Sequence, residues 1–301
     1  MNLNDAFLRV TIETEAQAEA VLSSPSVGLI WLDAGFFAPS SWKAFCQRAH
    51  AAGKRCGLRL PQIWRREATD FFAAQQQALR DAGFDALLLG SLESLGFLEQ
   101  AEIRLPLAFD ASIYDFSGFA DEALRQVVNL SAEHAADVSG KASAGDTAAG
   151  LAYPSVVQTL PLELSARELA PLCAEIENAG RKAELVVYGR TRMMLTAQCI
   201  RRTVLGCDKR PVVMELRDRT GARLSVKNCC RFCENRIYNA VPTLLCDERA
   251  ALNKLCHSFE RCDFTVETAE ETAAILAFYD APERAQKPKA FTRGYWKRGV
   301  L

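Results

Sequence analysis

Several familiar signatures are missing from this 301-residue chain. No G-x-G-x-x-G or G-x-x-x-x-G-K-[ST] loop follows a predicted strand, which argues against dinucleotide and nucleoside-triphosphate binding. Neither H-E-x-x-H nor G-x-S-x-G occurs, so no familiar zinc or serine hydrolase mechanism is supported. No apolar run reaches the roughly 18 residues that span a bilayer, and we expect no membrane insertion.

The first ten residues, MNLNDAFLRV, lack the basic and then apolar pattern of a secretory signal. We therefore expect a cytoplasmic, reducing location. In that setting clustered cysteines indicate metal ligands or catalytic groups in place of disulfides. Histidine is scarce, and its three copies are scattered along the chain: His50, His134 and His257.

The formal net charge of -1 argues against a protein that coats nucleic acid, but the charge is unevenly distributed. From Arg181 to Arg231 there are 13 Lys and Arg against four acids, a net charge of +9, which leaves -10 for the rest of the chain. This excess is either a solvated basic face or a set of positive groups that holds an anionic substrate, such as a carboxylate or a phosphate backbone.

Short apolar runs alternate with helical patterns through the first two hundred residues. LRVTIE (8–13), VGLIWLDAGF (27–36) and LPLAFDASI (105–113) are predicted strands. Such runs lack polar alternation, which favours strands that are buried on both faces, and parallel strands joined by helices meet this requirement. Six or seven units of this kind predict a TIM-barrel-like (β/α) barrel. Residues 131–150 are small, polar and aperiodic, and we expect a mobile insertion there.

A cysteine-rich segment follows the predicted strand ELVVYG. Its C-x7-C-x22-C-x2-C spacing contains the candidate metal ligands Cys199, Cys207, Cys230 and Cys233. Four-cysteine zinc sites usually pair two C-x2-4-C knuckles, and only the second pair has that form. Iron-sulfur clusters tolerate irregular spacing, so a 4Fe-4S cluster is favoured, with zinc or no metal as alternatives. Cys229 competes with its neighbour Cys230 as a ligand, and we prefer Cys230.

This segment replaces a βα connection at the C-terminal face of the barrel, where barrel enzymes carry their active sites. We divide the chain into βα barrel repeats (1–198), a cluster-binding segment (199–246) and a part that completes the barrel and ends in a basic tail (247–301). The remaining six cysteines are expected to be small core residues.

Taken together, the motifs resemble peptidase family U32, the collagenase-like peptidases. The resemblance covers the chain from about Leu8 onward and rests on ELVVYGR (184–190), the four-cysteine run, LRDRTG (216–221), CxxCENRIYNAVP (230–242), FTVET (264–268) and FTRGY (291–295). It implies a cysteine-ligated 4Fe-4S cluster near the mouth of the barrel.

The resemblance also implies an oxygen-independent hydroxylase-type enzyme. Several relatives of this kind act on an RNA base or a ubiquinone precursor, and prephenate serves some of them as the oxygen source. Glu184, Tyr188 and Arg190 would then be catalytic. An anionic substrate would be bound by Arg192, Arg201 and Arg202.

Two other functions stay open. The family name suggests a peptidase, which requires a nucleophile or an activated water that the sequence does not identify. The third possibility is a non-catalytic subunit. LRVTIE resembles the start of the second barrel region in longer relatives, and residues 111–117 lack the asparagine that the family usually carries there. We therefore also expect a heteromer with a paralogous U32 chain, which would complete the site. Activity that survives loss of the cluster would favour the peptidase, and co-purification with a paralogue would favour the subunit.

Overall fold

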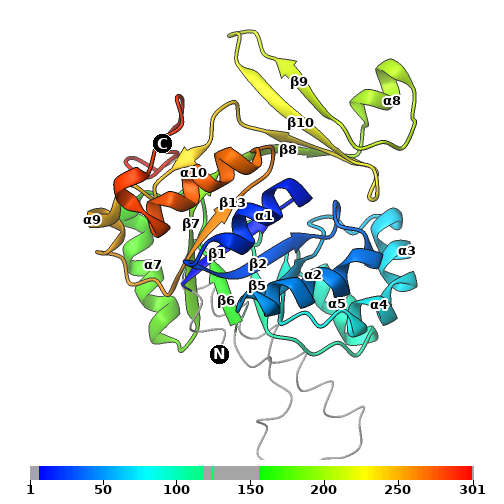
Figure 1. Ribbon diagram of the computed structural model, residues 1–301, viewed down its shortest axis with the longest axis horizontal. Coiled ribbons are helices and arrows are strands. Elements are labelled where there is room, and N and C mark those ends of the chain that lie inside the picture. The colour runs from blue at the N-terminus through cyan, green and yellow to red at the C-terminus, as the bar shows by residue number, and fades with distance from the viewer. Residues whose placement is uncertain (1–6, 115, 118–123, 125–155, 300–301) are drawn as a thin grey trace, which may run out of the picture.

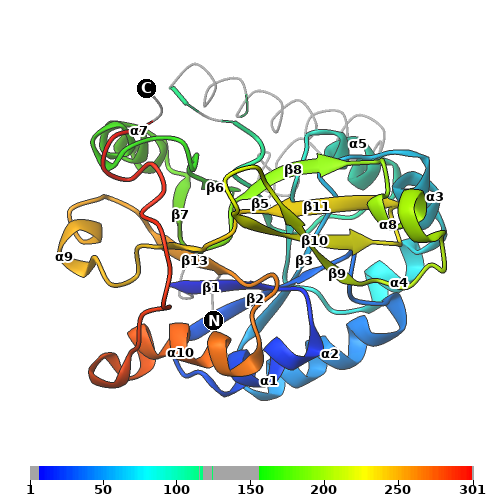
Figure 2. The ribbon, with the colours of Figure 1, turned by 90° about the horizontal axis from the view of Figure 1, so that it is seen from above.

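The computed structural model describes residues 7–114, 116–117, 124 and 156–299. The insertion expected at 131–150 lies outside these residues. Eight strands, each parallel to its neighbours, close into a barrel (Figures 1 and 2). In order around the barrel they are β1 (Leu8–Ile12), β2 (Val27–Asp33), β3 (Arg55–Arg59), β4 (Ala86–Leu89), β5 (Leu107–Phe109), β6 (Val156–Thr159), β7 (Lys182–Gly189) and β13 (Phe259–Asp263). The predicted TIM-barrel-like α/β fold is confirmed.

Helices connect the strands and cover the outside of the barrel. They are α1 (Glu15–Ser23), α2 (Pro39–Ala51), α3 (Arg66–Ala74), α4 (Gln76–Asp81), α5 (Glu93–Gln100), α7 (Ala166–Asn178), α9 (Arg249–Leu252) and α10 (Ala269–Asp280), with a 3-10 turn at Pro282–Arg284. Three of them begin with a capping box, in which Thr14, Ser165 or Thr268 accepts from the third helical residue. Among the described residues, no helix is long and apolar enough to cross a membrane.

Most of the core lies between the strands and the helices, and a smaller apolar cluster fills the barrel interior. Trp31 belongs to this inner cluster and is fully buried. It fits because Gly57 faces it: a Cβ at Gly57 would lie 2.3 Å from the indole ring. The guanidinium of Arg9 lies 3.4 Å from the centroid of the ring of Phe259, which belongs to the same inner cluster. The interior thus combines an apolar cluster with a buried charged group.

Between β7 and β13 the chain forms a separate four-stranded antiparallel sheet, here called the arm (residues 192–238). It contains β8 (Arg192–Thr196), α8 (Ile200–Leu205), β9 (Val213–Arg217), β10 (Arg223–Cys229) and β11 (Glu234–Tyr238), with strand order β8-β11-β10-β9. The short β12 (Thr243–Leu244) then pairs with β7. Figure 1 shows the arm across one end of the barrel. It stands where the sequence predicts that an ordinary βα connection is replaced.

Candidate functional site

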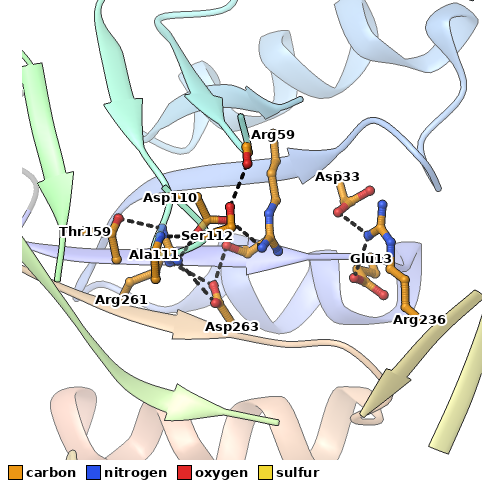
Figure 3. A network of polar contacts seen from close by, with 12 residues as sticks. Glu13, Asp33, Arg59, Asp110, Ala111, Ser112, Thr159, Arg236, Arg261 and Asp263 are labelled. Atoms are coloured by element: carbon orange, nitrogen blue, oxygen red, sulfur yellow. Dashed lines mark hydrogen bonds and ion pairs between the residues drawn. The ribbon is translucent and has the colours of Figure 1, made fainter. Parts of the chain in front are cut away.

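Arg261 is the centre of a buried ion-pair network at the C-terminal ends of the barrel strands (Figure 3). Its guanidinium donates to Asp110 at 2.6 Å and to Glu184 at 2.7 Å, and its Nε lies 2.9 Å from Asp263. Arg59 binds the other oxygen of Asp110 at 2.5 Å. Burial by itself would raise the pKa of Asp110, but Arg59 and Arg261 hold it well below its ordinary value. The network is therefore ionised.

The three residues that the resemblance assigns to catalysis lie on β7 or just after it. Glu184 is fully buried in the network and also pairs with Arg9 at 3.3 Å. Tyr188 donates to Glu267 at 3.3 Å, and the same carboxylate lies 3.4 Å from Nε of Arg190. Burial raises the pKa of Tyr188, and the charge of Glu267 raises it further. Tyr188 is thus a neutral hydrogen-bond donor at neutral pH.

A cavity of about 560 Å³ opens at the same mouth, between the barrel and β8. Five arginines line it, and four of them pair with a carboxylate: Arg59, Arg190, Arg261 and Arg293. The fifth, Arg192, has no side-chain hydrogen bond or ion pair within the described part of the chain. Burial lowers the pKa of Arg192, and the nearby charges of Arg59 and Arg236 lower it further. An anion bound beside Arg192 would relieve this repulsion.

A second cavity, of about 630 Å³, adjoins the first. Gln62, Ser112 and Tyr114 line both cavities, so the two lie side by side. The second cavity is largely apolar, and its walls include Ile63 and Leu92. Together the cavities can receive a molecule that has one anionic end and one apolar end.

Another buried network fixes the arm to the barrel (Figure 3). Arg236 on β11 donates to Asp33 at 2.6 Å and to Glu13 at 3.3 Å. Lys227 on β10 donates to Glu13 at 2.7 Å, and the hydroxyl of Tyr238 does so at 2.9 Å. Glu13 and Asp33 follow or end barrel strands, whereas their partners belong to the arm. Tyr238 also lines the 560 Å³ cavity, so this network positions part of its wall.

The turn between β10 and β11 packs against the barrel helices. The Phe232 ring is buried with its centroid 5.6 Å from that of Phe71 on α3. Arg231 donates to the backbone carbonyl of Phe37 at 2.8 Å, and Arg65 donates to that of Cys233 at 3.3 Å. The turn is therefore held from both sides, with Cys230 and Cys233 at its ends.

The four candidate metal ligands lie at the same end of the arm. Cys199 is the N-cap of α8, and Cys207 follows the helix by two residues. Burial raises the pKa of Cys230, and the thiols of Cys199, Cys207 and Cys233 contribute to the shift, so the four thiols are near enough to interact electrostatically. Among the described residues, however, no three His, Cys, Asp or Glu side chains are near enough to hold one metal ion. The cysteines are also absent from the lining of either cavity.

Two local features suit Cys199 and Cys233 to a ligand role. The sulfur of Cys199 accepts from the backbone N–H of Arg202 and from the amide of Asn228, both at 3.4 Å. Donors of this kind stabilise a thiolate or a cluster-bound sulfur. Cys233 has a φ of 54°, a left-handed conformation that is uncommon for a non-glycine residue. Strain of this type is typical of functional sites.

Arg201 and Arg202, the other candidate substrate-binding residues, lie on α8 outside both cavities. Arg201 donates through Nε to Asp208 at 3.0 Å, and Arg202 is exposed. Of the residues proposed for substrate binding, only Arg192 lines the cavity. The sequence reasoning did not single out Asp110, Asp263 or Tyr238. Only Asp110 offered a signal, as a polar residue within the predicted strand LPLAFDASI, because no strand was predicted at Asp263 or Tyr238.

No protein-family model and no curated protein matches the sequence. Two solved structures resemble the fold. An uncharacterized B. cereus protein has a TM-score of 0.43 and 9% identity, over 90% of this chain and 64% of that one. The 3-dehydroquinate dehydratase from Aquifex aeolicus VF5 has a TM-score of 0.36 and 13% identity, over 60% of this chain and 77% of that one. We infer no function from either similarity.

Proposed function

We propose that this protein is a U32-type iron-sulfur enzyme of the oxygen-independent hydroxylase type, which acts on an anionic substrate bound at the barrel mouth. The observation that carries the proposal is the arrangement of the arm. Its four cysteines lie at one end, and residues of β8 and β11 line the cavity at the other end. Tyr238 lies five positions after Cys233 along the chain, which is about 17 Å of extended strand.

The thiols Cys199, Cys207, Cys230 and Cys233 would hold a 4Fe-4S cluster. Such a cluster supplies one-electron chemistry when it is bound. The donor set suits iron because all four ligands are soft thiolates, and because the N–H groups of Arg202 and Asn228 already face the sulfur of Cys199. A single tetrahedral zinc ion is the alternative occupant, but it would require the four thiols to move closer together, because in the described residues no three of them are near enough to hold one metal ion.

Arg192 would bind the anionic group of the substrate. It is the cavity arginine without a carboxylate partner among the described residues, so a carboxylate or phosphate can complete its hydrogen bonding. Tyr238 lies on the same wall, with its hydroxyl held by Glu13. The ion pairs below, centred on Arg261, would keep the cavity floor rigid while the substrate binds.

The test is anaerobic purification followed by absorption spectroscopy and by iron and sulfide analysis. We expect about four iron and four sulfide per chain. Incubation with candidate acids and a tRNA pool, in the presence of prephenate as the oxygen donor, followed by mass spectrometry, should find a product heavier by one oxygen atom. Zinc in place of iron, or a metal-free protein with native stability, would overturn the proposal.

Replacement of one ligand separates a cluster effect from a general loss of fold. Cys230→Ala should lose iron, whereas Cys256→Ala, at an exposed thiol outside the arm, should retain it. Peptide cleavage that persists in Cys230→Ala would favour the peptidase. A protein that carries iron but forms product only after a paralogous chain is added would support the subunit function.

A further inference from the structure

The short helix α8 contributes no residue to the protein core. Val204 and Leu205 are among the most exposed large hydrophobic side chains of the described chain, at 72% and 71%. A six-residue helix is unstable without packing. Here it is held by the cap at Cys199, by the hydroxyl of Thr203, which donates to the backbone carbonyl of Cys199, and by the contact between Arg201 and Asp208. An apolar face on such a helix indicates contact with another molecule.

Positive charge surrounds this apolar face. Arg202, Lys209 and Arg210 are exposed, and none of their side chains has an ion pair or hydrogen bond within the described residues. The one acid beside them, Asp208, already accepts from Arg201. We call this surface the α8 patch and define it as Arg202, Val204, Leu205, Lys209 and Arg210.

The α8 patch adjoins the four thiols. Cys199 caps the start of α8, and Cys207 lies between Leu205 and Lys209 in the chain. A molecule seated on the patch would therefore be next to the proposed cluster and at the opposite end of the arm from the cavity.

From the apolar centre, the basic rim and the position beside the thiols, we infer that the α8 patch docks an acidic electron-carrier protein of the ferredoxin or flavodoxin class. This inference rests on the proposed iron-sulfur function. The reduced carrier would give up one electron and the cluster would accept it, with no atom transferred. Small, charge-steered interfaces are typical of such transient redox encounters.

Two other occupants fit the patch less well. Single-stranded RNA binds by stacking its bases on aromatic side chains, and residues 190–231 include no Phe, Tyr or Trp. A second copy of this chain in a symmetric dimer would set two basic patches against each other, because a two-fold interface pairs the same surface with itself. An acidic protein meets neither difficulty.

The experiment is isothermal titration of the anaerobically purified, iron-containing protein with an oxidised acidic 2Fe-2S ferredoxin, at 20 and 200 mM salt. We expect micromolar affinity at low salt and at least tenfold weaker binding at high salt. Lys209→Gln/Arg210→Gln should weaken low-salt binding about tenfold and reduce its salt dependence. Leu205→Ser should weaken binding at both salt concentrations.

Arg217→Gln/Arg219→Gln is the matched control. It removes the same charge from the same arm, at the β9–β10 hairpin that Figures 1 and 2 show at the far end from α8. This control should bind ferredoxin as the wild type does. Equal losses in both double variants, or no binding by the wild type, would overturn the docking inference.

Further measurements distinguish failure of the docking inference from failure of the proposed function. Bleaching of the iron-sulfur absorption by dithionite, without ferredoxin binding, would leave the function intact and reject the docking. An iron-free protein would reject both. Two further results would overturn the inference by assigning the patch to another occupant. One is single-stranded RNA that displaces ferredoxin and binds Lys209→Gln/Arg210→Gln more weakly than it binds the wild type. The other is a dimer, seen by ultracentrifugation, that dissociates in this variant.

Discussion

Gly35 and Cys229 meet where the arm touches the barrel. The sulfur of Cys229 lies 3.6 Å from the carbonyl oxygen of Gly35, and a Cβ on Gly35 would lie 2.6 Å from that sulfur. Cys229 is fully buried, which raises the pKa of its thiol to about 12. Its neighbour Cys230 lies instead among the thiols of the arm. Adjacent cysteines therefore have different surroundings, one in the barrel contact and one in the candidate metal site.

Cys230→Ala should lose the metal, whereas Cys229→Ala should retain it. A thiolate removed from a cluster has no ready substitute, while the buried Cys229 faces the barrel. We expect Cys229→Ala to cost about 1 kcal/mol of unfolding free energy from lost packing. Iron analysis after anaerobic purification measures the first effect and urea unfolding the second. Iron retained in Cys230→Ala and lost in Cys229→Ala would reverse the ligand assignment.

Gly35→Ala should destabilise the protein by roughly 1 to 3 kcal/mol because the added methyl group overpacks the contact. Besides the Cys229 sulfur, it would meet an oxygen of Asp33 at 2.9 Å. Gly96→Ala is the control: this glycine lies within α5 with open space around its Cβ position, so the change should stabilise by about 0.5 to 1 kcal/mol.

The double variant Gly35→Ala/Cys229→Ala tests the cause of that loss. Removing the sulfur relieves the shortest contact, so the double variant should be more stable than the sum of the two single effects predicts. Simple additivity would show that the strain lies elsewhere. Denaturant unfolding curves of the four proteins complete the cycle.

The barrel was predictable because its strands and helices produce local, periodic patterns. VGLIWLD is buried along nearly its whole length, as a strand between the barrel interior and the outer helices requires. The position of the arm was predictable as well, because the cysteine segment interrupts the βα alternation. The four antiparallel strands of the arm were not predictable, because a run such as LRDRTGARL has a polar hairpin at its centre and little apolar periodicity.

The candidate site was only partly predictable, because ion pairing depends on residues far apart in the chain. Arg261 contacts Asp110 across 151 positions, and Lys227 contacts Glu13 across 214. A sequence shows which arginines are present and leaves open which of them have partners. Arg192 and Arg201 looked equivalent, yet Arg201 pairs with Asp208 and Arg192 faces the cavity.

Arg192→Gln should weaken the binding of small carboxylates such as benzoate and prephenate about ten- to hundredfold. Each charge-assisted hydrogen bond is worth roughly 1.5 to 3 kcal/mol. Arg219→Gln removes an exposed arginine at the arm's hairpin and should leave this affinity unchanged. Equal affinities for wild type and Arg192→Gln in calorimetric titrations would contradict the role of Arg192. A steep loss of tRNA-pool binding with salt, beside a shallow one for benzoate, would indicate contacts with several phosphates.

Glu260 should make the stability of the protein depend on pH in the acid range. It is fully buried on β13 and accepts from both terminal nitrogens of Arg249, at 2.6 and 2.5 Å, and from His257 at 3.1 Å. Burial by itself would raise its pKa, but these hydrogen bonds and ion pairs lower it to about 2. Because the folded pKa lies below the unfolded value of roughly 4.3, the stabilisation is complete above that value and is lost as the pH falls toward 2. Glu260→Gln should therefore be roughly 3 kcal/mol less stable than the wild type at pH 7, and this difference should shrink steadily below pH 4.

Glu283→Gln is the control. It changes an exposed carboxylate and should alter the free energy of unfolding by less than about 0.5 kcal/mol both at pH 7 and below pH 4. Urea unfolding of the three proteins at pH 7, 4 and 3 measures these differences, and a Glu260→Gln difference that stays constant from pH 7 to 3 would show that the ion pairs of Glu260 do not stabilise the fold.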